Sequence, residues 1–466
     1  SRYLRRISEE LGPGLREKPF LVMQSSGGVM SSQQVVRKPI ATALSGPAAG
    51  ALGSVVIAKI AGFEDVVTLD AGGTSTDICL IESGVAKITN SGSVGPFPVR
   101  IPMIDVRTVG TGGGSIAWIT REGHLKVGPR SAGAVPGPMC YPEGGDQPTI
   151  TDANLVLGRI PDALIGGGIR LDSRRAREGI ADLGRRLKSG MSVEQLAEGI
   201  IEIANWNQAN CIRQMTIQRG IDPRGFALLS FGGSGPAQSP AVMELLRMKA
   251  CIVPLNPGNL SAFGLLAVDW RTDHITTRVT QEDALDPDEL ERIYCQLEAD
   301  AVETLRNDGI DPAMIRIARE ADVRYLGQSM EVRVPAPAGS IEAGFVTTLL
   351  ESFHAAHEKA FGYGYRGRQK VEVVNYCVSG FGVMDRPRLP TLPTGAADSA
   401  RSRTTRQVFF GGGFVQTPIY DRNDLPAGAR LRGPAVVEEF GSTTVVFPGQ
   451  RMSVDPHGIM VVERIA

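Results

Sequence analysis

The residues with the clearest capacity for chemistry lie in the segment Val66–Ile81, where two runs of aliphatic and β-branched residues flank a Gly-Gly-Thr turn. The two runs predict a pair of strands joined by that turn. Glycines in such a turn let the backbone approach a ligand and direct its N–H groups at a phosphate. Asp70 ends the first run and Asp77 begins the second, so the two carboxylates can hold Mg²⁺ directly or through its water molecules. The alternative is an ordinary hairpin with two solvated acidic residues.

A second glycine-rich loop follows the buried strand that we predict for Phe226–Ser230. The loop has the sequence Phe-Gly-Gly-Ser-Gly-Pro, and a helix is expected after it, from about Ser239 to Met248. A strand, a Gly-Gly-Ser-Gly loop and a helix in this order let a flat nucleoside or a phosphate lie against the backbone. The loop alone is weak evidence, but its combination with the hairpin indicates a nucleotide site.

Two further segments are rich in small residues. A helix is predicted to start within Leu44–Gly50 and to reach about Gly62, with Ser45 or Gly46 as its cap and Pro47 at the first helical position. The start of this helix is either a second anion site or a stretch whose small residues allow close packing, and both readings stay open.

A loop with three consecutive glycines, Gly110–Ser115, follows the strand predicted for Ile104–Val109. Ordering so many glycines costs conformational entropy. We therefore expect this loop to contact a ligand or another segment of backbone, and ordinary loop packing is the alternative.

Residues 128–152 show almost no helical or strand periodicity, which is typical of a functional loop in a compact enzyme. Their most useful polar groups are Arg130, Tyr141 and Asp152. Cys140 is a candidate nucleophile, but no histidine lies near it in sequence to activate it. A buried, unreactive thiol is therefore the favoured interpretation of Cys140.

The composition is that of a globular protein with no preference for polyanions. The chain has 466 residues, a length that suggests about three domains. Lys and Arg total 49 against 50 Asp and Glu, so nothing indicates a nucleic-acid or membrane partner. The 6 cysteines are scattered without a C-x-x-C pair, which argues against zinc and favours a reducing, cytoplasmic location. No apolar run is long enough to span a membrane, and no signal peptide leads the chain.

The pattern changes near Trp270, and the remainder predicts an α+β region followed by strands. His354 and His357 lie one turn apart on a predicted helix, Ile341–Phe361, but no third metal ligand is evident, so we expect a structural role. The last segment has turn signals typical of a small sandwich or barrel. The predicted parts are a core at 1–275, an α+β domain at 276–384, a linker at 385–405 and a β-rich domain at 406–466.

The motifs taken together resemble the hydantoinase A / 5-oxoprolinase family along essentially the whole chain. The segments that carry the resemblance are Asp70–Asp77, Leu44–Gly50, Gly128–Ala134, Phe231–Pro236, Leu260–Leu266 and Gly433–Glu439. The resemblance implies an α/β, actin-like ATPase core (the acetate and sugar kinase, Hsp70 and actin fold). The hairpin is then its second phosphate loop and Gly232–Gly235 its adenosine loop.

Two departures from the family pattern accompany this resemblance. The family has an N-terminal segment with another Asp-x-Gly-Gly-Thr loop, and residues 1–466 contain only the one at Asp70. Because the chain also begins without methionine, we expect that a longer polypeptide was cut here and that the chain alone hydrolyses ATP poorly. In addition, Gln238 stands where a histidine is expected after the adenosine loop.

The resemblance also implies ATP and Mg²⁺ as cofactors and assigns roles to residues. The residues assigned to phosphate binding are Gly72, Gly73, Thr74 and Thr76. The residues assigned to adenosine contact are Gly232, Gly233, Ser234 and Gly235. Asp70 and Asp77 are assigned to catalysis through Mg²⁺ or water positioning, and Arg130 to a substrate or phosphate contact.

Members of the family cleave cyclic amides of the hydantoin or 5-oxoproline type at the expense of ATP, and usually work with a B-type subunit. The first hypothesis is therefore ATP-dependent hydrolysis of a cyclic amide after phosphorylation of its ring carbonyl oxygen. The second is a subunit of an ATP-dependent ketone carboxylase, in which an enolate oxygen is phosphorylated. The third is a structural subunit without turnover, which the intact pair Asp70 and Asp77 disfavours.

Overall fold

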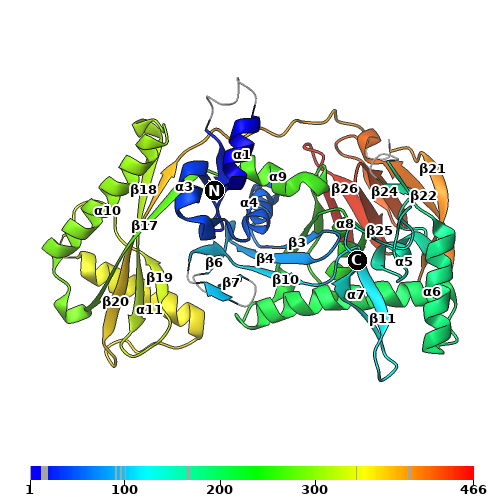
Figure 1. The fold of residues 1–466 in the computed structure, drawn as a ribbon, viewed down its shortest axis with the longest axis horizontal. Helices are drawn as coiled ribbons and strands as arrows, with labels where there is room; N and C mark the ends of the chain where they lie inside the picture. Colours follow the sequence, from blue (N-terminus) through cyan, green and yellow to red (C-terminus); the bar gives the residue numbers. More distant parts are fainter. Residues whose placement is uncertain are drawn as a thin grey trace. The chain divides into compact units, whose positions relative to one another are not determined.

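The computed structural model describes residues 2–11, 19–89, 92–94, 97–99, 101–164, 168–342, 344–396 and 400–465. The chain forms two compact units, each made of two stretches: residues 1–43 with 268–386, and residues 44–267 with 387–466 (Figure 1). No helix among the described residues is long and apolar enough to cross a membrane. The domain limits expected from the sequence remain predictions.

The larger unit, residues 44–267 with 387–466, is built around a 9-stranded mixed sheet. In spatial order its strands are β10 (Val106–Val109), β4 (Thr76–Glu82), β3 (Val66–Ala71), β15 (Ala227–Phe231), β16 (Cys251–Val253), β27 (Met460–Arg464), β26 (Gln450–Val454) and β23 (Arg430–Arg432), and β5 (Val85–Ala86) pairs with β4. Strand β15 lies parallel to β3 and to β16, which places the ends of β3 and β15 at the same edge of the sheet. Both glycine-rich loops therefore begin at this edge.

Helices α4, α7 and α8 contact this sheet, and three further helices complete the larger unit (Figure 1). Their bounds are α4 (Ser45–Ile60), α5 (Ile150–Val156), α6 (Ser173–Leu187), α7 (Val193–Ile217), α8 (Gly235–Leu246) and α9 (Leu260–Leu266). Leu69 and Ala71 of β3 share one core with Ile212 of α7 and Val242 of α8. Successive strand residues point to opposite faces. Asp70 therefore points away from α7 and α8, toward the face where Ser261 of α9 lies.

The expected small sandwich or barrel at the C-terminus is wrong. Part of this segment does form a 4-stranded sheet, β21 (Thr404–Phe410), β22 (Gly413–Asp421), β24 (Ala435–Glu439) and β25 (Ser442–Val446). The strands β23, β26 and β27 instead extend the central sheet, because β27 pairs antiparallel with β16. Strand periodicity predicts a strand but not its partner, so this pairing was not visible in the sequence.

Helix α4 starts differently from the prediction. It begins at Ser45, its cap is Leu44 in the left-handed conformation, and no side chain caps it, so Pro47 is not at the first helical position. Of the two interpretations given for its small residues, close packing agrees with the positions of Gly50 and Gly53. A Cβ on Gly50 would lie 2.8 Å from the Phe231 ring, and one on Gly53 would lie 3.0 Å from the carbonyl oxygen of Leu260.

The smaller unit, residues 1–43 with 268–386, contains a 6-stranded sheet whose apolar core includes residues of α10 and α11. Its elements are α1 (Arg2–Glu10), β1 (Leu21–Met23), β2 (Val29–Ser31), α3 (Ser32–Arg37), β17 (Trp270–Gln281), α10 (Pro287–Asn307), β18 (Ile315–Tyr325), β19 (Val332–Pro335), α11 (Phe345–Phe361) and β20 (Val371–Gly382). His354 Nδ1 lies 2.9 Å from the Tyr325 hydroxyl. The buried His357 places one ring nitrogen 3.0 Å from the Tyr363 carbonyl oxygen and the other 3.2 Å from Gln328 Oε1. These contacts support a structural role for both histidines.

The rest of the described strands form two-stranded sheets in the larger unit. They are β6 (Ile88–Thr89) with β9 (Met103–Ile104), β7 (Gly92–Val94) with β8 (Phe97–Val99), β11 (Ser115–Ile119) with β12 (Leu125–Ser131), and β13 (Ala163–Leu164) with β14 (Ile169–Arg170). The predicted unstructured segment 128–152 is thus shorter than expected, because β12 continues to Ser131 and α5 begins at Ile150.

Candidate active site

The hairpin predicted from Val66–Ile81 is present as the antiparallel pair β3 and β4. Its register places Asp70 directly opposite Asp77, so the two side chains lie on the same face. Ser261 donates a hydrogen bond to Asp70 Oδ2 at 3.5 Å, and Thr108 donates one to Asp77 Oδ1 at 2.6 Å. The geometry thus brings together the two carboxylates that the sequence selected for Mg²⁺.

The environment of this pair disfavours its charged form. Burial, together with the charge of Asp77, raises the pKa of Asp70 to about 6, and the hydrogen bond from Ser261 offsets only part of this. Burial likewise raises the pKa of Asp77, against the bond from Thr108. A divalent cation between two carboxylates in a partly desolvated site stabilises their charged forms.

A site with two carboxylates suits Mg²⁺ better than a metal ion that is coordinated by protein side chains alone. In the parts of the chain that the structure describes, no group of 3 or more His, Cys, Asp or Glu side chains is placed to hold a metal ion. Mg²⁺ retains several waters and is commonly bound by one or two carboxylates together with substrate phosphates. Asp70 and Asp77 therefore fit Mg²⁺ that arrives with a nucleotide.

The turn between the two strands offers free backbone donors. The N–H of Gly72 is used within the turn, where it donates to the Ser75 carbonyl oxygen at 3.1 Å. Within the described residues, the N–H groups of Gly73 and Thr74 have no hydrogen-bond partner. A Cβ on Gly73 would meet nothing within 4 Å, so the space beside it is open. These free donors make the turn suitable for an anion.

The loop with three glycines contacts this turn through its backbone. Contact with another segment of backbone was one of the roles expected for this loop. Gly113 donates to the Gly72 carbonyl oxygen at 2.9 Å, and Gly114 to the Gly73 carbonyl oxygen at 2.6 Å. A Cβ on Gly112 would lie 2.7 Å from that same Gly72 oxygen. Only glycine permits this approach, so the loop holds the turn in place from one side.

The second glycine-rich loop lies beside the hairpin. Ser234 donates its N–H to the Ala71 carbonyl oxygen at 2.9 Å, which joins this loop directly to β3. Gly232 has a φ of +79°, and a Cβ there would lie 2.5 Å from the same oxygen. Helix α8 begins at Gly235 rather than near Ser239, because a proline in the first helical turn is compatible with a helix start. The first turn of α8 therefore opens directly beside the loop.

The two loops form the wall of one cavity of about 210 Å³. Its lining comprises Gly72, Gly73, Gly113, Gly114, Gly133, Pro138, Tyr141, Thr151, Asn154, Ile160, Leu164, Gly233, Ser234, Ala237, Gly441, Ser442 and Thr443. Four of the predicted nucleotide-binding residues thus come together here. Asp70 and Asp77 do not line this cavity themselves, but Asp70 is adjacent to the second loop, since a Cβ on Gly232 would lie 2.6 Å from Asp70 Oδ1.

Three of the polar residues selected from the sequence have structural contacts instead. Thr76 is fully buried, and its hydroxyl donates to the Thr111 carbonyl oxygen. Asp152 accepts hydrogen bonds from Thr149 Oγ1 at 2.7 Å and from the N–H of Cys140 at 2.8 Å, which caps α5 and fixes the preceding loop. Burial raises the pKa of the Cys140 thiol, in agreement with an unreactive cysteine. These contacts give the three side chains structural roles rather than roles in ligand binding.

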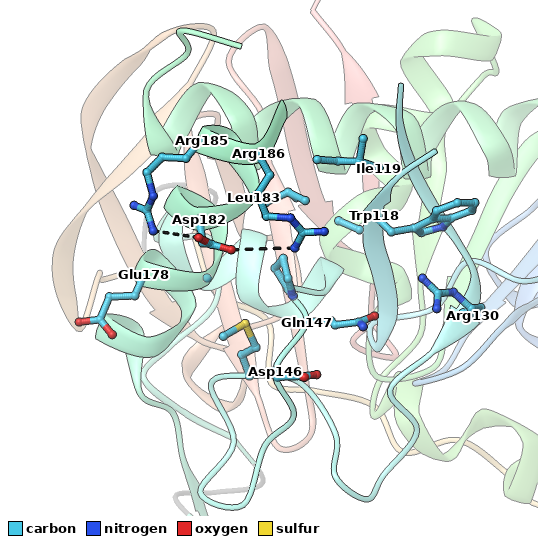
Figure 2. Close-up of a pocket in the computed structure, with 14 residues that line it drawn as sticks. Trp118, Ile119, Arg130, Asp146, Gln147, Glu178, Asp182, Leu183, Arg185 and Arg186 are labelled. Atoms are coloured by element: carbon cyan, nitrogen blue, oxygen red, sulfur yellow. Dashed lines mark hydrogen bonds and ion pairs between the residues drawn. The ribbon is translucent and has the colours of Figure 1, made fainter. Parts of the chain in front are cut away.

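Arg130 lies in a different place from the other predicted residues. It lines a second cavity, of about 420 Å³, between the β11–β12 hairpin and α6. Figure 2 shows its guanidinium beside Trp118, 5.2 Å from the ring centroid, on the side of the cavity away from Arg185. Arg185 is paired with Asp182 at 3.0 Å. A phosphate contact by Arg130 therefore has no support from this geometry.

Several lining residues were not predicted from the sequence. Thr151 donates its hydroxyl to the Gly113 carbonyl oxygen at 2.9 Å, and a Cβ on Gly233 would lie 3.2 Å from the Gly441 carbonyl oxygen. Gly441 belongs to the β24–β25 turn, far along the chain from either glycine-rich loop. The only local signal for these positions was the aperiodic segment that ends near α5.

Comparisons with known proteins cover the whole chain. The family described as Hydantoinase/oxoprolinase matches residues 1–274, and the Hydantoinase/oxoprolinase C-terminal domain matches residues 279–465. The caprolactamase subunit alpha of Pseudomonas jessenii is 36% identical over 98% of this chain and 66% of its own length. The crystal structure of the ATP-dependent caprolactamase from Pseudomonas jessenii matches with a TM-score of 0.85 at 34% identity, covering 99% of this chain and 68% of that one.

A nucleotide-free acetone carboxylase structure, from a study of ATP-dependent acetone carboxylation, matches with a TM-score of 0.81 at 26% identity, over 99% of this chain and 66% of that one. The chain thus spans about two thirds of the length of these relatives. The expected α/β fold with a β-rich C-terminal region is confirmed. This protein belongs to the hydantoinase/oxoprolinase family, whose members include ATP-dependent enzymes.

Proposed function

We propose that this chain carries the nucleotide site of an enzyme that hydrolyses a cyclic amide at the expense of ATP. The observation that carries the proposal is the convergence of two glycine-rich loops on one cavity, beside a pair of carboxylates on the hairpin. The substrate class is taken from the caprolactamase relative, whose name denotes an enzyme that cleaves a lactam.

The chemistry explains why such an enzyme consumes ATP. Resonance makes the carbonyl carbon of a ring amide a poor electrophile and its nitrogen a poor leaving group. Transfer of the γ-phosphoryl group to the carbonyl oxygen, with release of ADP, ends this resonance. Water then adds to the carbon and the ring C–N bond breaks, which leaves an acyl phosphate on the opened chain. A second water hydrolyses this acyl phosphate and releases inorganic phosphate. The protein has to position these groups and neutralise charge, as in phosphoryl transfer generally.

The residues of this chain have the groups that these tasks require. The free N–H groups of Gly73 and Thr74 bind phosphate oxygens at the hairpin tip. The N-terminus of α8, whose cap Ser234 makes no side-chain capping bond, contributes further free donors beside the cavity. Asp70 and Asp77 would hold Mg²⁺ through their carboxylates, and the cation would supply neutralisation of the phosphate charge.

A partner subunit is part of the proposal. The caprolactamase relative is itself named as a subunit alpha, so its enzyme contains at least one further subunit. We propose that a B-type subunit supplies substrate-binding groups to this protein. The second cavity beside Arg130 remains a candidate for substrate contact only within such an assembly.

A ketone carboxylase is the second candidate function. It is favoured by the match to acetone carboxylase along nearly the whole chain. In that reaction the phosphoryl group goes to an enolate oxygen, and the same phosphate and cation groups serve both chemistries.

The functional assembly, with its partner subunit, distinguishes these candidates. Phosphate release from Mg-ATP should be measured with hydantoin, 5-oxoproline and caprolactam, and separately with acetone or acetophenone plus bicarbonate. We expect release that depends on a lactam and matches ring opening one to one. Release that depends on ketone and bicarbonate would establish the carboxylase instead. Absence of both stimulated release and thermal stabilisation by Mg-ATP would contradict both candidates.

Binding of Mg²⁺-nucleotide is expected to weaken in mild acid. Asp70 has a pKa of about 6 without the cation, and the cation requires its deprotonated form. Protonation therefore competes with Mg²⁺ below this pH, and affinity should fall about tenfold between pH 7 and pH 5. Isothermal titration of Mg-ATP across this range tests the effect. Nucleotide binding without a divalent cation serves as the control and should not show this proton competition.

A further inference from the structure

Two buried polar atoms in the cavity have no hydrogen-bond partner. Asn154 on α5 is 3% exposed and Ser442 at the start of β25 is 6% exposed, and both residues line the cavity. Among the described residues, neither Asn154 Oδ1 nor Ser442 Oγ is hydrogen-bonded. Unsatisfied buried polar atoms are uncommon in folded proteins, and they call for a partner. A ligand in the cavity is the natural source of that partner.

Asp152, in the same segment, is an example of a buried polar side chain with a structural role, because its carboxylate is fully hydrogen-bonded. Asp152, two positions before Asn154, accepts hydrogen bonds from the N–H groups of Met139, Cys140 and Thr149. Its carboxylate is therefore fully used in holding the loop. The unpartnered oxygen of Asn154 has no comparable role in the fold.

The surroundings of these atoms suit a flat heteroaromatic ring. Pro138, Ile160, Leu164 and the half-buried Tyr141 line the same cavity as Asn154. Gly137 lies close to the Tyr141 ring, because a Cβ on Gly137 would lie only 3.0 Å from it. Ligand sites commonly combine apolar and aromatic walls with a few polar groups that fix orientation. The glycine turn provides the phosphate end of the cavity, so this part fits the base.

We propose that Asn154 and Ser442 recognise the base of the bound nucleotide and select adenine. The carboxamide of Asn154 is complementary to adenine, since its oxygen accepts from the exocyclic amino group while its nitrogen donates to a ring nitrogen. Ser442 Oγ donates to a second ring nitrogen. This inference rests on the proposed ATP site and assigns its specificity to residues outside the two glycine-rich loops.

The test compares ATP with ITP, which carries an oxygen where ATP carries the amino group. Isothermal titration of the functional assembly with each Mg-nucleotide should give about 10–100-fold tighter binding of ATP. Asn154→Leu keeps the branching of the side chain at Cγ but removes its hydrogen-bonding atoms, so the ratio of the two dissociation constants should fall to about 1. Ser442→Ala, a smaller change, should weaken both nucleotides about threefold to tenfold.

A matched control is Asn210→Leu, because Asn210 is exposed on α7 and does not line the cavity. It should leave the ATP to ITP ratio unchanged. An unchanged ratio in Asn154→Leu at the wild-type melting temperature would overturn this inference while leaving the ATP site intact. If Asn154→Leu does not fold, wild-type affinities for both nucleotides in Ser442→Ala would overturn it. Absence of binding of either nucleotide to the wild type would overturn the proposed function itself.

Discussion

Asp70→Asn is expected to lower turnover at least a hundredfold while it raises the stability of the folded protein. The loss follows from the cation site, since a catalytic contact to a metal ion contributes several kcal/mol to transition-state stabilisation. The gain follows from the raised pKa of Asp70, about 6, which means that the fold disfavours the charged carboxylate. Asparagine removes that charge and keeps the shape, so stability at pH 7.5 should rise by about 1–3 kcal/mol without Mg²⁺.

The sign of the pH dependence makes this prediction specific. Between pH 4 and pH 6 the folded protein retains a proton on Asp70 that the unfolded chain has lost, so wild-type stability decreases as the pH rises. The advantage of Asp70→Asn should therefore grow over this range and level off above it. Thermal unfolding and steady-state phosphate release measure the two effects. Asp65→Asn is the control at the other end of β3, and near-normal turnover in Asp70→Asn would exclude Asp70 from the mechanism.

Gly232→Ala is expected to destabilise the protein by about 2–4 kcal/mol and to abolish nucleotide binding. The added Cβ would lie 2.5 Å from the Ala71 carbonyl oxygen and 2.6 Å from Asp70 Oδ1, at a φ of +79° that alanine rarely adopts. Because the first of these atoms is backbone, the hairpin and the loop have to move apart. Their separation disrupts both walls of the cavity.

Denaturant unfolding and isothermal titration with Mg-ATP test this prediction. The control is Gly258→Ala, because a Cβ on Gly258 meets nothing within 4 Å and should change stability by less than about 0.5 kcal/mol. Equal stability of the two variants would mean that the Gly232 loop does not pack on the hairpin as described.

The parts of the site that could be predicted were those encoded within one short segment. The hairpin from Val66 to Glu82 was predicted correctly, because its β-branched runs and its glycine turn are adjacent in sequence. The same holds for the strand Ala227–Phe231, although the helix after it begins earlier than expected. The register that places Asp70 opposite Asp77 follows from the short turn between them.

The remainder depends on contacts between distant segments, which periodicity does not encode. Gly441 meets Gly233, just before α8, because β25 packs against that helix. Thr76 looked like a phosphate ligand because it follows the turn, but strand alternation directs its side chain into the interior. Arg130 was selected as a polar group of the aperiodic segment 128–152, and its strand carries it to a different cavity.

The central claim is that nucleotide phosphates bind at the tip of the hairpin. A structure of the functional assembly with Mg²⁺ and a non-hydrolysable ATP analogue tests it most directly. We expect phosphate oxygens within hydrogen-bond distance of the N–H groups of Gly73 and Thr74, with Mg²⁺ on the side of Asp70 and Asp77 and the base beside Asn154. A nucleotide bound away from the hairpin and the Gly232–Gly235 loop, at full occupancy, would contradict it.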